Sequence, residues 1–386
     1  MKNLIKFSQS VCALERNGEY MGDKRILDVE QVLYDKKAAS VLLVCGNSFQ
    51  EQELYDKICC AAKAMGAKLT EFSEFAPNPK YESVVEGVRV FQENSCDFII
   101  AAGGGSAIDV AKCIKLFWNM DGNQNYLEQE IVENPVPVLA IPTTAGTGSE
   151  ATRFAIIYYK GNKQSVSHPS CIPEYVLLDA SLLQTLPAYQ RKATMLDALC
   201  HALESFWSVN STEESRAYAE EAIGEVFRYQ KDYLENDCAG NEGMLQAANT
   251  AGRAINITQT TAGHAMCYKL TTLYGLAHGH AAALCVSALW PYMIEHMEDC
   301  TDPRGREYLE EMFQRIARAM DCTDALTAVG KYQKFLEELA LPAPVQKNIE
   351  ELELLKKSVN PDRLKNNPVL LTEEVLEALY RQILSS

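Results

Sequence analysis

The sequence predicts an α/β dinucleotide-binding domain with a mostly parallel sheet over residues 1–181, followed by an all-helical domain over residues 182–386. Two patterns support this fold class. Short β-rich runs alternate with helical stretches in the first half, and the second half contains only long helical patterns. The length of 386 residues also exceeds what one hydrophobic core normally serves. We therefore expect the ligand site in a cleft between the two halves.

The first half contains several runs of β-branched and apolar residues that are typical of strands. Strands are predicted at residues 41–46, 67–72, 97–104 and 136–144. Between them, apolar residues recur at spacings of three and four, which predicts helices over 49–66, 81–95 and 107–118. This alternation indicates a parallel sheet with helices on both faces, and extended segments 154–159 and 175–180 follow it.

The second half repeats the helical period without a β-rich run. Helices are predicted over 189–209, 215–236, 242–257, 278–297, 303–320, 324–338, 346–357 and 372–384.

Composition excludes several classes of function. A formal net charge of −16 argues against nucleic acid or an anionic membrane as the partner, since both require a basic face. The sequence shows no secretory leader and no apolar run long enough to span a bilayer, so we expect a cytoplasmic protein. The 13 cysteines include no C-x-x-C pair, which favours reduced, buried thiols over disulfides or a zinc ribbon.

The run "FIIAAGGGSAIDVAK" leads from a predicted strand through three glycines into a predicted helix. Backbone amides in such a turn and at the helix N-terminus attract a phosphate, and the absence of Cβ atoms allows its close approach. The spacing departs from G-x-G-x-x-G because Ile108 holds the last position, so a plain tight turn is the alternative. The candidate cofactor residues are Gly103, Gly104, Gly105, Ser106 and Asp109.

A second loop, "IPTTAGTGSEAT", follows the next predicted strand and is rich in hydroxyl groups. An ordinary Ser/Thr/Gly loop is the alternative, but two such loops at the ends of neighbouring strands favour a nucleotide. This loop contributes Thr143, Thr144, Thr147 and Ser149 to the predicted cofactor site, and Lys163 is added from the segment beyond it.

The end of the first predicted strand bears on the form of the cofactor. Sites that select NADH often place a carboxylate there to bind the ribose hydroxyls. This chain has Gly46, Asn47 and Ser48 instead. No carboxylate in this run would repel a 2′-phosphate, so NADP(H) is favoured over NAD(H).

Four side chains suggest a metal. Asp197 and His201 are four residues apart on a predicted helix and therefore share one face. Adding His264 and His278 gives one oxygen and three nitrogen ligands, a set suited to Fe²⁺ or Zn²⁺. Each histidine taken singly is more often structural, and spacing alone leaves both interpretations open.

Together, "GGGSAIDVAK", "PTTAGTGSEAT", "LDALCHALES" and "GHAMCYKLTTLYGLAHGHAAAL" resemble the iron-containing (group III) alcohol dehydrogenase family. The resemblance implies that family's fold, which is similar to that of dehydroquinate synthase. It also implies metal-dependent, NAD(P)H-linked interconversion of aldehydes and primary alcohols, with Fe²⁺ as the first expectation and a homodimer as the assembly. The metal ligands it implies are Asp197, His201, His264 and His278.

The sequence departs from the family at one position of interest. Many members carry a further histidine four residues after the position of His264, where this chain has Tyr268. A tyrosine hydroxyl can donate and accept, but its pKa near 10 makes it a different proton relay. The candidate catalytic residues are therefore Tyr268 and His280, with water as a third route.

The C-terminal motif also bears on the substrate. It resembles the subgroup that reduces phosphonoacetaldehyde to 2-hydroxyethylphosphonate. A phosphonate dianion in so acidic a chain requires local cations, and Arg153, Lys269 and Arg253 are the candidates, each with a solvated surface cation as the alternative.

Three other functions remain open. One is a general short-chain alcohol or lactaldehyde dehydrogenase of the same family, which a substrate panel distinguishes. A second is a lyase related to dehydroquinate synthase. The third is a non-enzymatic helical scaffold, which would leave both glycine-rich loops unexplained.

Overall fold

The computed structural model describes residues 10–13, 29–348 and 350–384, the first group by its backbone alone. The chain forms two compact units. The sheet unit comprises Met1–Thr144 and Ser149–Thr185, and the helical unit comprises Ala145–Gly148 and Leu186–Ser386. Residues 145–148, in the middle of the second glycine-rich loop, thus belong to the helical unit.

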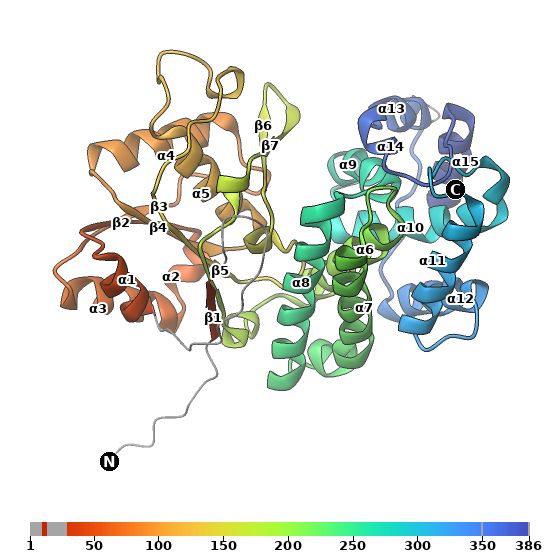
Figure 1. Cartoon of the computed structure of the whole chain (residues 1–386), viewed down its shortest axis with the longest axis horizontal. Coiled ribbons are helices and arrows are strands. Elements are labelled where there is room, and N and C mark those ends of the chain that lie inside the picture. The colour runs from red at the N-terminus through yellow and green to blue at the C-terminus, as the bar shows by residue number, and fades with distance from the viewer. Residues whose placement is uncertain (1–9, 14–28, 349, 385–386) are drawn as a thin grey trace. The chain divides into compact units, whose positions relative to one another are not determined.

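The sheet unit is built on a six-stranded sheet with the order β1-β8-β5-β4-β2-β3 (Figure 1). Its pairings are parallel except for that of β1 with β8, which is antiparallel. The strands are β1 Ser10–Ala13, β2 Ser40–Cys45, β3 Lys68–Phe72, β4 Phe98–Gly103, β5 Val138–Pro142 and β8 Tyr175–Leu178.

Side chains of the central strands alternate between two hydrophobic clusters, as the pleat requires. In β2, Leu42 and Val44 join a cluster with residues of α4 and α5, whereas Val41 and Leu43 join a cluster with residues of α1 and α3. Helices therefore cover both faces of the sheet. They are α1 Val29–Lys36, α2 Asn47–Gln50, α3 Glu53–Ala64, α4 Tyr81–Glu93 and α5 Gly105–Phe117.

A separate antiparallel hairpin, β6 Phe154–Tyr159 with β7 Asn162–Ser167, also lies in the sheet unit. The first of these segments was predicted from the sequence to be extended, and the second was not predicted as a strand. Four short 3₁₀ helices complete the unit: η1 Tyr126–Glu128, η2 Ser149–Ala151, η3 Pro169–Cys171 and η4 Ala180–Leu183.

The helical unit consists of helices that range from one turn to about six turns in length (Figure 1). They are α6 Ala188–Trp207, α7 Glu213–Leu234, α8 Cys238–Thr258, α9 Ala262–Tyr274, α10 His278–Glu295, η5 Met297–Asp299, α11 Arg306–Ala319, α12 Ala325–Leu339, α13 Glu350–Ser358, α14 Pro361–Leu364 and α15 Glu373–Ile383. A parallel-sheet domain followed by an all-helical domain is the fold class that the sequence predicted, and that prediction is confirmed.

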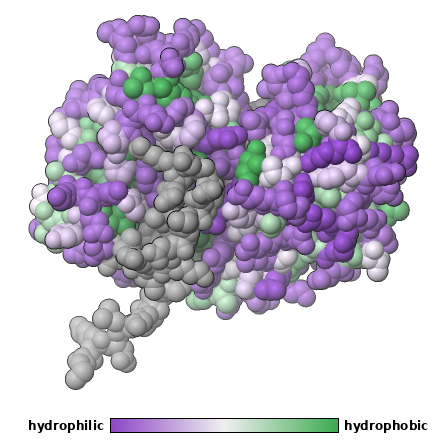
Figure 2. Space-filling view, in the orientation of Figure 1, coloured by the Kyte–Doolittle hydropathy of each residue, from purple (hydrophilic) through white to green (hydrophobic). Residues whose placement is uncertain are grey.

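Polar side chains start several of these helices. Thr212 and Ser215 form a reciprocal capping box at α7, and Asp237 accepts from two backbone amides at the start of α8. Figure 2 shows hydrophilic residues over most of the visible surface, with hydrophobic residues in small separate groups. Across the described residues, no helix is both long enough and apolar enough to cross a membrane.

Candidate functional site

Three helices of the helical unit bring the predicted metal ligands together. Asp197 and His201 lie one turn apart on α6, His264 lies in the first turn of α9, and His278 begins α10. Helix α9 ends at Tyr274 and is capped by Gly275, whose φ of 69° is in the left-handed region that glycine adopts easily. The short turn that follows leads directly into His278.

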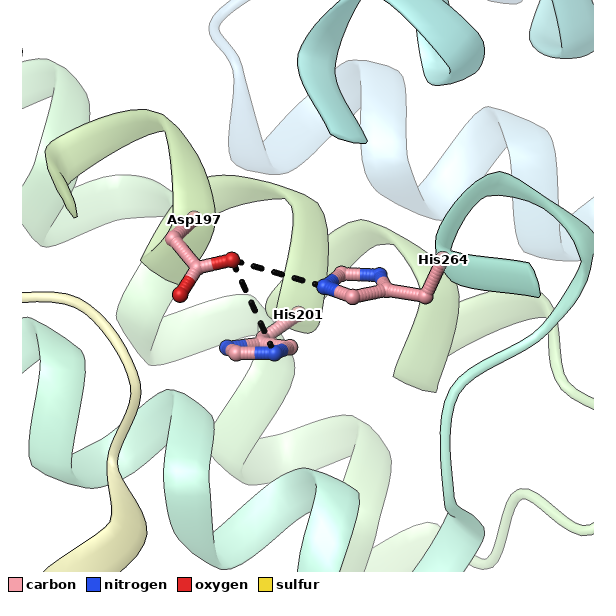
Figure 3. A group of neighbouring side chains, drawn as sticks. All are labelled: Asp197, His201 and His264. Carbon is pink, nitrogen blue, oxygen red and sulfur yellow. Dashed lines mark ion pairs between the residues drawn. The ribbon is translucent and has the colours of Figure 1, made fainter. Parts of the chain in front are cut away.

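The nitrogen atoms converge on one carboxylate oxygen. Asp197 Oδ1 lies 3.5 Å from His264 Nε2, 3.9 Å from His201 Nε2 and 4.0 Å from His278 Nε2. Figure 3 shows the Asp197 carboxylate directed at the imidazoles of His201 and His264. Bonds of about 2.1 Å to a tetrahedral ion place neighbouring ligand atoms about 3.4 Å apart. The observed spacings are thus long for hydrogen bonds and close to the edge lengths of a metal site.

The burial of these atoms supports the same interpretation. Asp197 is 2% exposed, His201 6% and His264 1%. Within the described part of the chain, Asp197 Oδ1 and His264 Nε2 are buried and have no hydrogen-bond partner. Buried polar atoms are normally satisfied, and a cation between these two would satisfy both. The His278 side chain is 38% exposed, so one side of the cluster is open.

The charges in the cluster also favour a cation. Burial acts to raise the pKa of Asp197, but His201, His278 and His264 outweigh it and hold the pKa below the usual range. Burial lowers the pKa of His201 to about 4, against the pull of Asp197. Burial acts in the same direction on His264, but Glu204 and Asp197 raise its pKa to about 10. The buried carboxylates of Asp197 and Glu204 therefore favour a positive charge in this part of the helical unit.

Glu204, which sequence analysis did not select, holds His264 in place. Its fully buried carboxylate lies 2.8 Å from His264 Nδ1 and accepts from the His264 backbone N–H at 2.8 Å. It also accepts from the backbone N–H of Thr261 and, at 2.9 Å, from the Thr261 hydroxyl. A carboxylate at Nδ1 fixes the ring orientation and directs Nε2 toward Asp197, as a metal ligand would require. Glu204 could have been found from the sequence as an acidic residue seven positions after Asp197, on the same face of the predicted helix.

Two glycines beside the histidines allow the helices to approach closely. A Cβ on Gly279 would lie 2.0 Å from the Ala193 carbonyl oxygen and 2.6 Å from Asp197 Cβ, so α10 meets α6 here without a side chain. A Cβ on Gly263 would lie 2.3 Å from Glu204 Oε1. The positions of His264 and His278 therefore depend on glycine as their neighbour.

The two predicted proton-relay residues occupy different environments. The Tyr268 ring stacks on His278, with centroids 5.7 Å apart and planes at 5°. His280 is buried, and its Nδ1 lies 3.1 Å from the hydroxyl of Tyr189, which also accepts from the backbone N–H of Ala277. Burial lowers the pKa of His280, and the Pro342 backbone partly offsets this. Tyr268 thus borders the cluster directly, and His280 is linked to the turn before His278 through the Tyr189 hydroxyl.

The predicted phosphate-binding turns meet at one edge of the sheet. Strands β4 and β5 are parallel neighbours that end at Gly103 and Pro142, and the Thr143 N–H donates to the Gly103 carbonyl at 3.0 Å. A Cβ on Gly104 would be 3.4 Å from the Thr144 methyl group, so the two turns touch. Helix α5 begins at Gly105 with its N-terminus at this edge. The arrangement fits the phosphate groups of a dinucleotide.

The other predicted cofactor residues lie around these turns. Strand β2, next to β4, ends just before Gly46, and Asn47 and Ser48 are exposed at the start of α2. Ser106 is half-buried in the first turn of α5, and Lys163 is half-buried in β7. Thr147 belongs to the segment 145–148 of the helical unit. In that segment, Gly146 packs on Thr194 of α6 and Gly148 on Gly252 of α8.

The side chains of Asp109 and Ser149 are buried and form a hydrogen bond with each other. The Ser149 hydroxyl donates to Asp109 Oδ1 at 2.6 Å, and the Ile156 N–H donates to Oδ2 at 3.0 Å. The fully buried Lys112, which sequence analysis missed, donates to the carbonyls of Ser149, Thr152 and Phe154 at 2.5, 2.8 and 2.7 Å. These three side chains fix the backbone that follows the second loop.

The candidate substrate cations lie on different elements. Lys269 follows Tyr268 on α9 and is half-buried. Arg253 follows Gly252 on α8, and its Nε donates to Asn249 at 3.1 Å. Arg153 is in the sheet unit, where its guanidinium lies 5.3 Å from the centre of the Phe154 ring.

Known proteins resemble this chain in both units. Residues 19–180 match the sequence model of iron-containing alcohol dehydrogenase, and residues 192–384 match the C-terminal model of the Fe-containing alcohol dehydrogenase family. The phosphonoacetaldehyde reductase of Streptomyces viridochromogenes is 31% identical over 317 residues, which are 77% of this chain and 79% of that protein.

Two solved structures share the fold. An iron-containing alcohol dehydrogenase from Thermotoga maritima is 29% identical, with a TM-score of 0.78 over 92% of this chain and 93% of that one. The sulfoacetaldehyde reductase of Bifidobacterium kashiwanohense, in complex with NAD⁺, is 24% identical, with a TM-score of 0.83 over 93% and 94% of the two chains.

Proposed function

This chain belongs to the iron-containing alcohol dehydrogenase family, and we propose that within it the protein reduces phosphonoacetaldehyde to 2-hydroxyethylphosphonate with NADPH and a divalent metal. Oxidoreductase activity on alcohols or aldehydes follows from family membership. The observation that carries the proposed chemistry is the convergence of three imidazoles on Asp197 Oδ1, which is buried without a hydrogen-bond partner among the described residues.

The proposed metal ligands are Asp197, His201, His264 and His278. Fe²⁺ is our first expectation and Zn²⁺ the second, since both accept a mixed oxygen and nitrogen set. When bound, such an ion supplies Lewis-acid polarisation of the aldehyde carbonyl.

The chain's own residues hold the site and supply the proton. Glu204 orients His264, and the burial of Asp197 and His201 keeps water from the inner side of the cluster. A bound nicotinamide would supply the hydride for the aldehyde carbon, and the carbonyl oxygen would need a proton from the protein. We assign this proton transfer to Tyr268, whose ring stacks on His278, with His280 as the alternative donor.

We propose that the cofactor's pyrophosphate binds where β4 and β5 end. Gly103, Gly104 and the N-terminus of α5 offer backbone amides there, beside the Thr143 and Thr144 segment. The run from Gly46 to Ser48 has no carboxylate, which supports NADPH over NADH.

The proposed substrate rests on the relative from Streptomyces viridochromogenes and on the cations Lys269, Arg253 and Arg153. A phosphonate is a dianion near neutral pH, so at least one of these residues should pair with it. Arginine is the better bidentate partner.

The test uses protein reloaded with Fe²⁺ or Zn²⁺ and a panel of aldehydes with NADPH and NADH. We expect the highest kcat/KM with phosphonoacetaldehyde and NADPH. His264→Ala should lose both bound metal and activity, whereas His296→Ala, which changes a half-exposed histidine paired with Glu298, should keep both. Full activity in metal-free His264→Ala would overturn the mechanism.

The same panel separates the general alcohol dehydrogenase function from the proposed one. Equal kcat/KM values for propanal and phosphonoacetaldehyde would overturn the assignment of the phosphonate, and the metal chemistry would stand. A kcat/KM with NADH more than tenfold above that with NADPH would overturn the cofactor preference alone.

A further inference from the structure

We infer that Glu71 is a cofactor-specificity residue whose carboxylate opposes a ribose 2′-phosphate at the segment that follows β2. The inference rests on the proposed function, because it assumes that a dinucleotide binds along the carboxyl edge of the sheet. Glu71 supplies a negative charge next to the run from Gly46 to Ser48, which contains none itself.

Glu71 is held against that segment by two hydrogen bonds. It lies on the edge strand β3, opposite Leu43 of the parallel neighbour β2. Its Oε2 accepts from Gln50 Nε2 at 2.8 Å, and its Oε1 accepts from the Tyr55 hydroxyl at 2.6 Å. Gln50 is the last residue of α2, which begins at Asn47. The carboxylate therefore lies beside the residues proposed to face the ribose.

The order of the strands places the adenosine end of a dinucleotide on this side. The phosphate-binding turn follows β4, which has β5 on one side and β2 on the other, with β3 beyond β2. The segment after β2 contains Asn47 and Ser48, the residues proposed to face the ribose, so we place the adenine ribose beside β2 and β3.

The charge of Glu71 acts on the start of this segment. Burial raises the pKa of the Cys45 thiol to about 12, and Glu71 adds to the effect. Cys45 directly precedes Gly46, so the negative potential extends to the turn itself. Glu71 also occupies the Tyr55 hydroxyl and the Gln50 amide, two donors that would otherwise be free to hold a phosphate.

A 2′-phosphate brings about two further negative charges to this place, and a ribose hydroxyl brings none. Repulsion between a dianion and one carboxylate several ångströms apart, in largely aqueous surroundings, corresponds to about a tenfold difference in affinity. Because no carboxylate follows β2, the site would favour NADPH, and the charge of Glu71 reduces this preference.

The experiment compares Glu71→Gln with the wild type in the full-length protein. Dissociation constants for ADP-ribose and 2′-phospho-ADP-ribose are measured by calorimetry, and those for NADH and NADPH by nucleotide fluorescence, all without turnover. We expect the ratio of affinities to shift about tenfold toward the 2′-phosphorylated ligand, with little change for the unphosphorylated one.

Two variants serve as controls. Glu93→Gln removes the same charge from the last turn of α4, where the residue pairs with Arg89, and should shift the ratio less than about twofold. Tyr55→Phe removes a donor but keeps the Glu71 charge, and its shift should be well below that of Glu71→Gln.

A shift of less than about twofold in Glu71→Gln, or an equal shift in Glu93→Gln, would overturn the inference. A wild type that prefers NADH would overturn the cofactor preference proposed above, while the comparison between variant and wild type would still decide the role of Glu71. Failure of the wild type to bind either nucleotide would overturn both.

Discussion

Replacing Glu204 by glutamine tests how the helical unit holds the His264 ring, whose Nε2 we propose as a metal ligand. The carboxylate accepts from four groups, the backbone N–H and Nδ1 of His264 and the backbone N–H and hydroxyl of Thr261. Glutamine offers one acceptor oxygen where glutamate has two, and its NH₂ group then faces donors. Each hydrogen bond to a charged group contributes about 1.5–3 kcal/mol, so we expect unfolding free energy to fall by about 3 kcal/mol after local adjustment.

Metal affinity should fall as well, for a separate reason. An anionic acceptor at Nδ1 fixes the His264 ring and makes Nε2 more basic, and loss of such a partner costs about tenfold to a hundredfold in affinity. The dissociation constant is measured by competition with a coloured chelator, and stability by urea unfolding with and without metal.

Glu225→Gln on α7 is the matched control, since it makes the same substitution at a half-buried glutamate away from the cluster. Metal binding by Glu204→Gln within about twofold of the wild type would contradict the role given to Glu204. So would unfolding of that variant at the same urea concentration as the wild type.

Three further substitutions probe the same unit. Gly279→Ala places a methyl group against Ala193 and Asp197 and should reduce unfolding free energy by about 1–3 kcal/mol, together with metal retention measured by elemental analysis. Burial, and then Glu221, raises the pKa of Glu225 to about 7. Ionising this carboxyl in the folded protein is therefore unfavourable, and the free energy of unfolding falls as pH rises from the ordinary glutamate range through 7. Glu225→Gln should therefore raise unfolding free energy by about 1 kcal/mol at pH 8 and leave it unchanged at pH 4, because partial exposure screens the charge. Cys267→Ala removes the thiol 3.6 Å from His278 Nδ1 and should weaken metal binding severalfold in chelator competition.

Each of these predictions has its own control. Gly224→Ala in α7 meets no atom within 4 Å and should leave metal content unchanged, so equal metal loss there would contradict the packing argument. A pH-independent effect of Glu225→Gln would contradict the assigned pKa. Cys113→Ala, at a buried thiol of the sheet unit, should not alter metal affinity, and an equal effect would remove the role given to Cys267.

The sequence predicted the central strands well because each is a short apolar run. The prediction of 41–46 corresponds to β2 Ser40–Cys45, and that of 97–104 to β4 Phe98–Gly103. Strands buried on both faces need continuous apolar residues, which leave a clear pattern. Strand β7, "NKQSVS", has no such pattern, and its conformation depends on pairing with β6.

The candidate site was predictable only where its residues are close in sequence. Helical spacing placed Asp197 and His201 on one face. His264 and His278 were candidates by residue type, but spacing alone left a structural role open for each histidine. The contacts of Glu204 with Thr261 and His264 join residues far apart in the chain, and no local pattern records them. The contact of Glu71 with Tyr55 is hidden in the same way, because it crosses from β3 to α3.

The proposed metal site and the packing of the three helices depend on the same contacts. Gly279 lets α10 approach Asp197, and Gly263 lets α9 approach Glu204, which holds His264. An ion that binds only the folded unit raises its free energy of unfolding by an amount that grows with the logarithm of the ion's concentration over its dissociation constant. Variants of Glu204 and Gly279 should therefore lose metal-dependent stabilisation, measured as the difference in unfolding free energy with and without metal. Glu225→Gln should shift both unfolding curves equally at pH 8, because Glu225 lies outside these contacts.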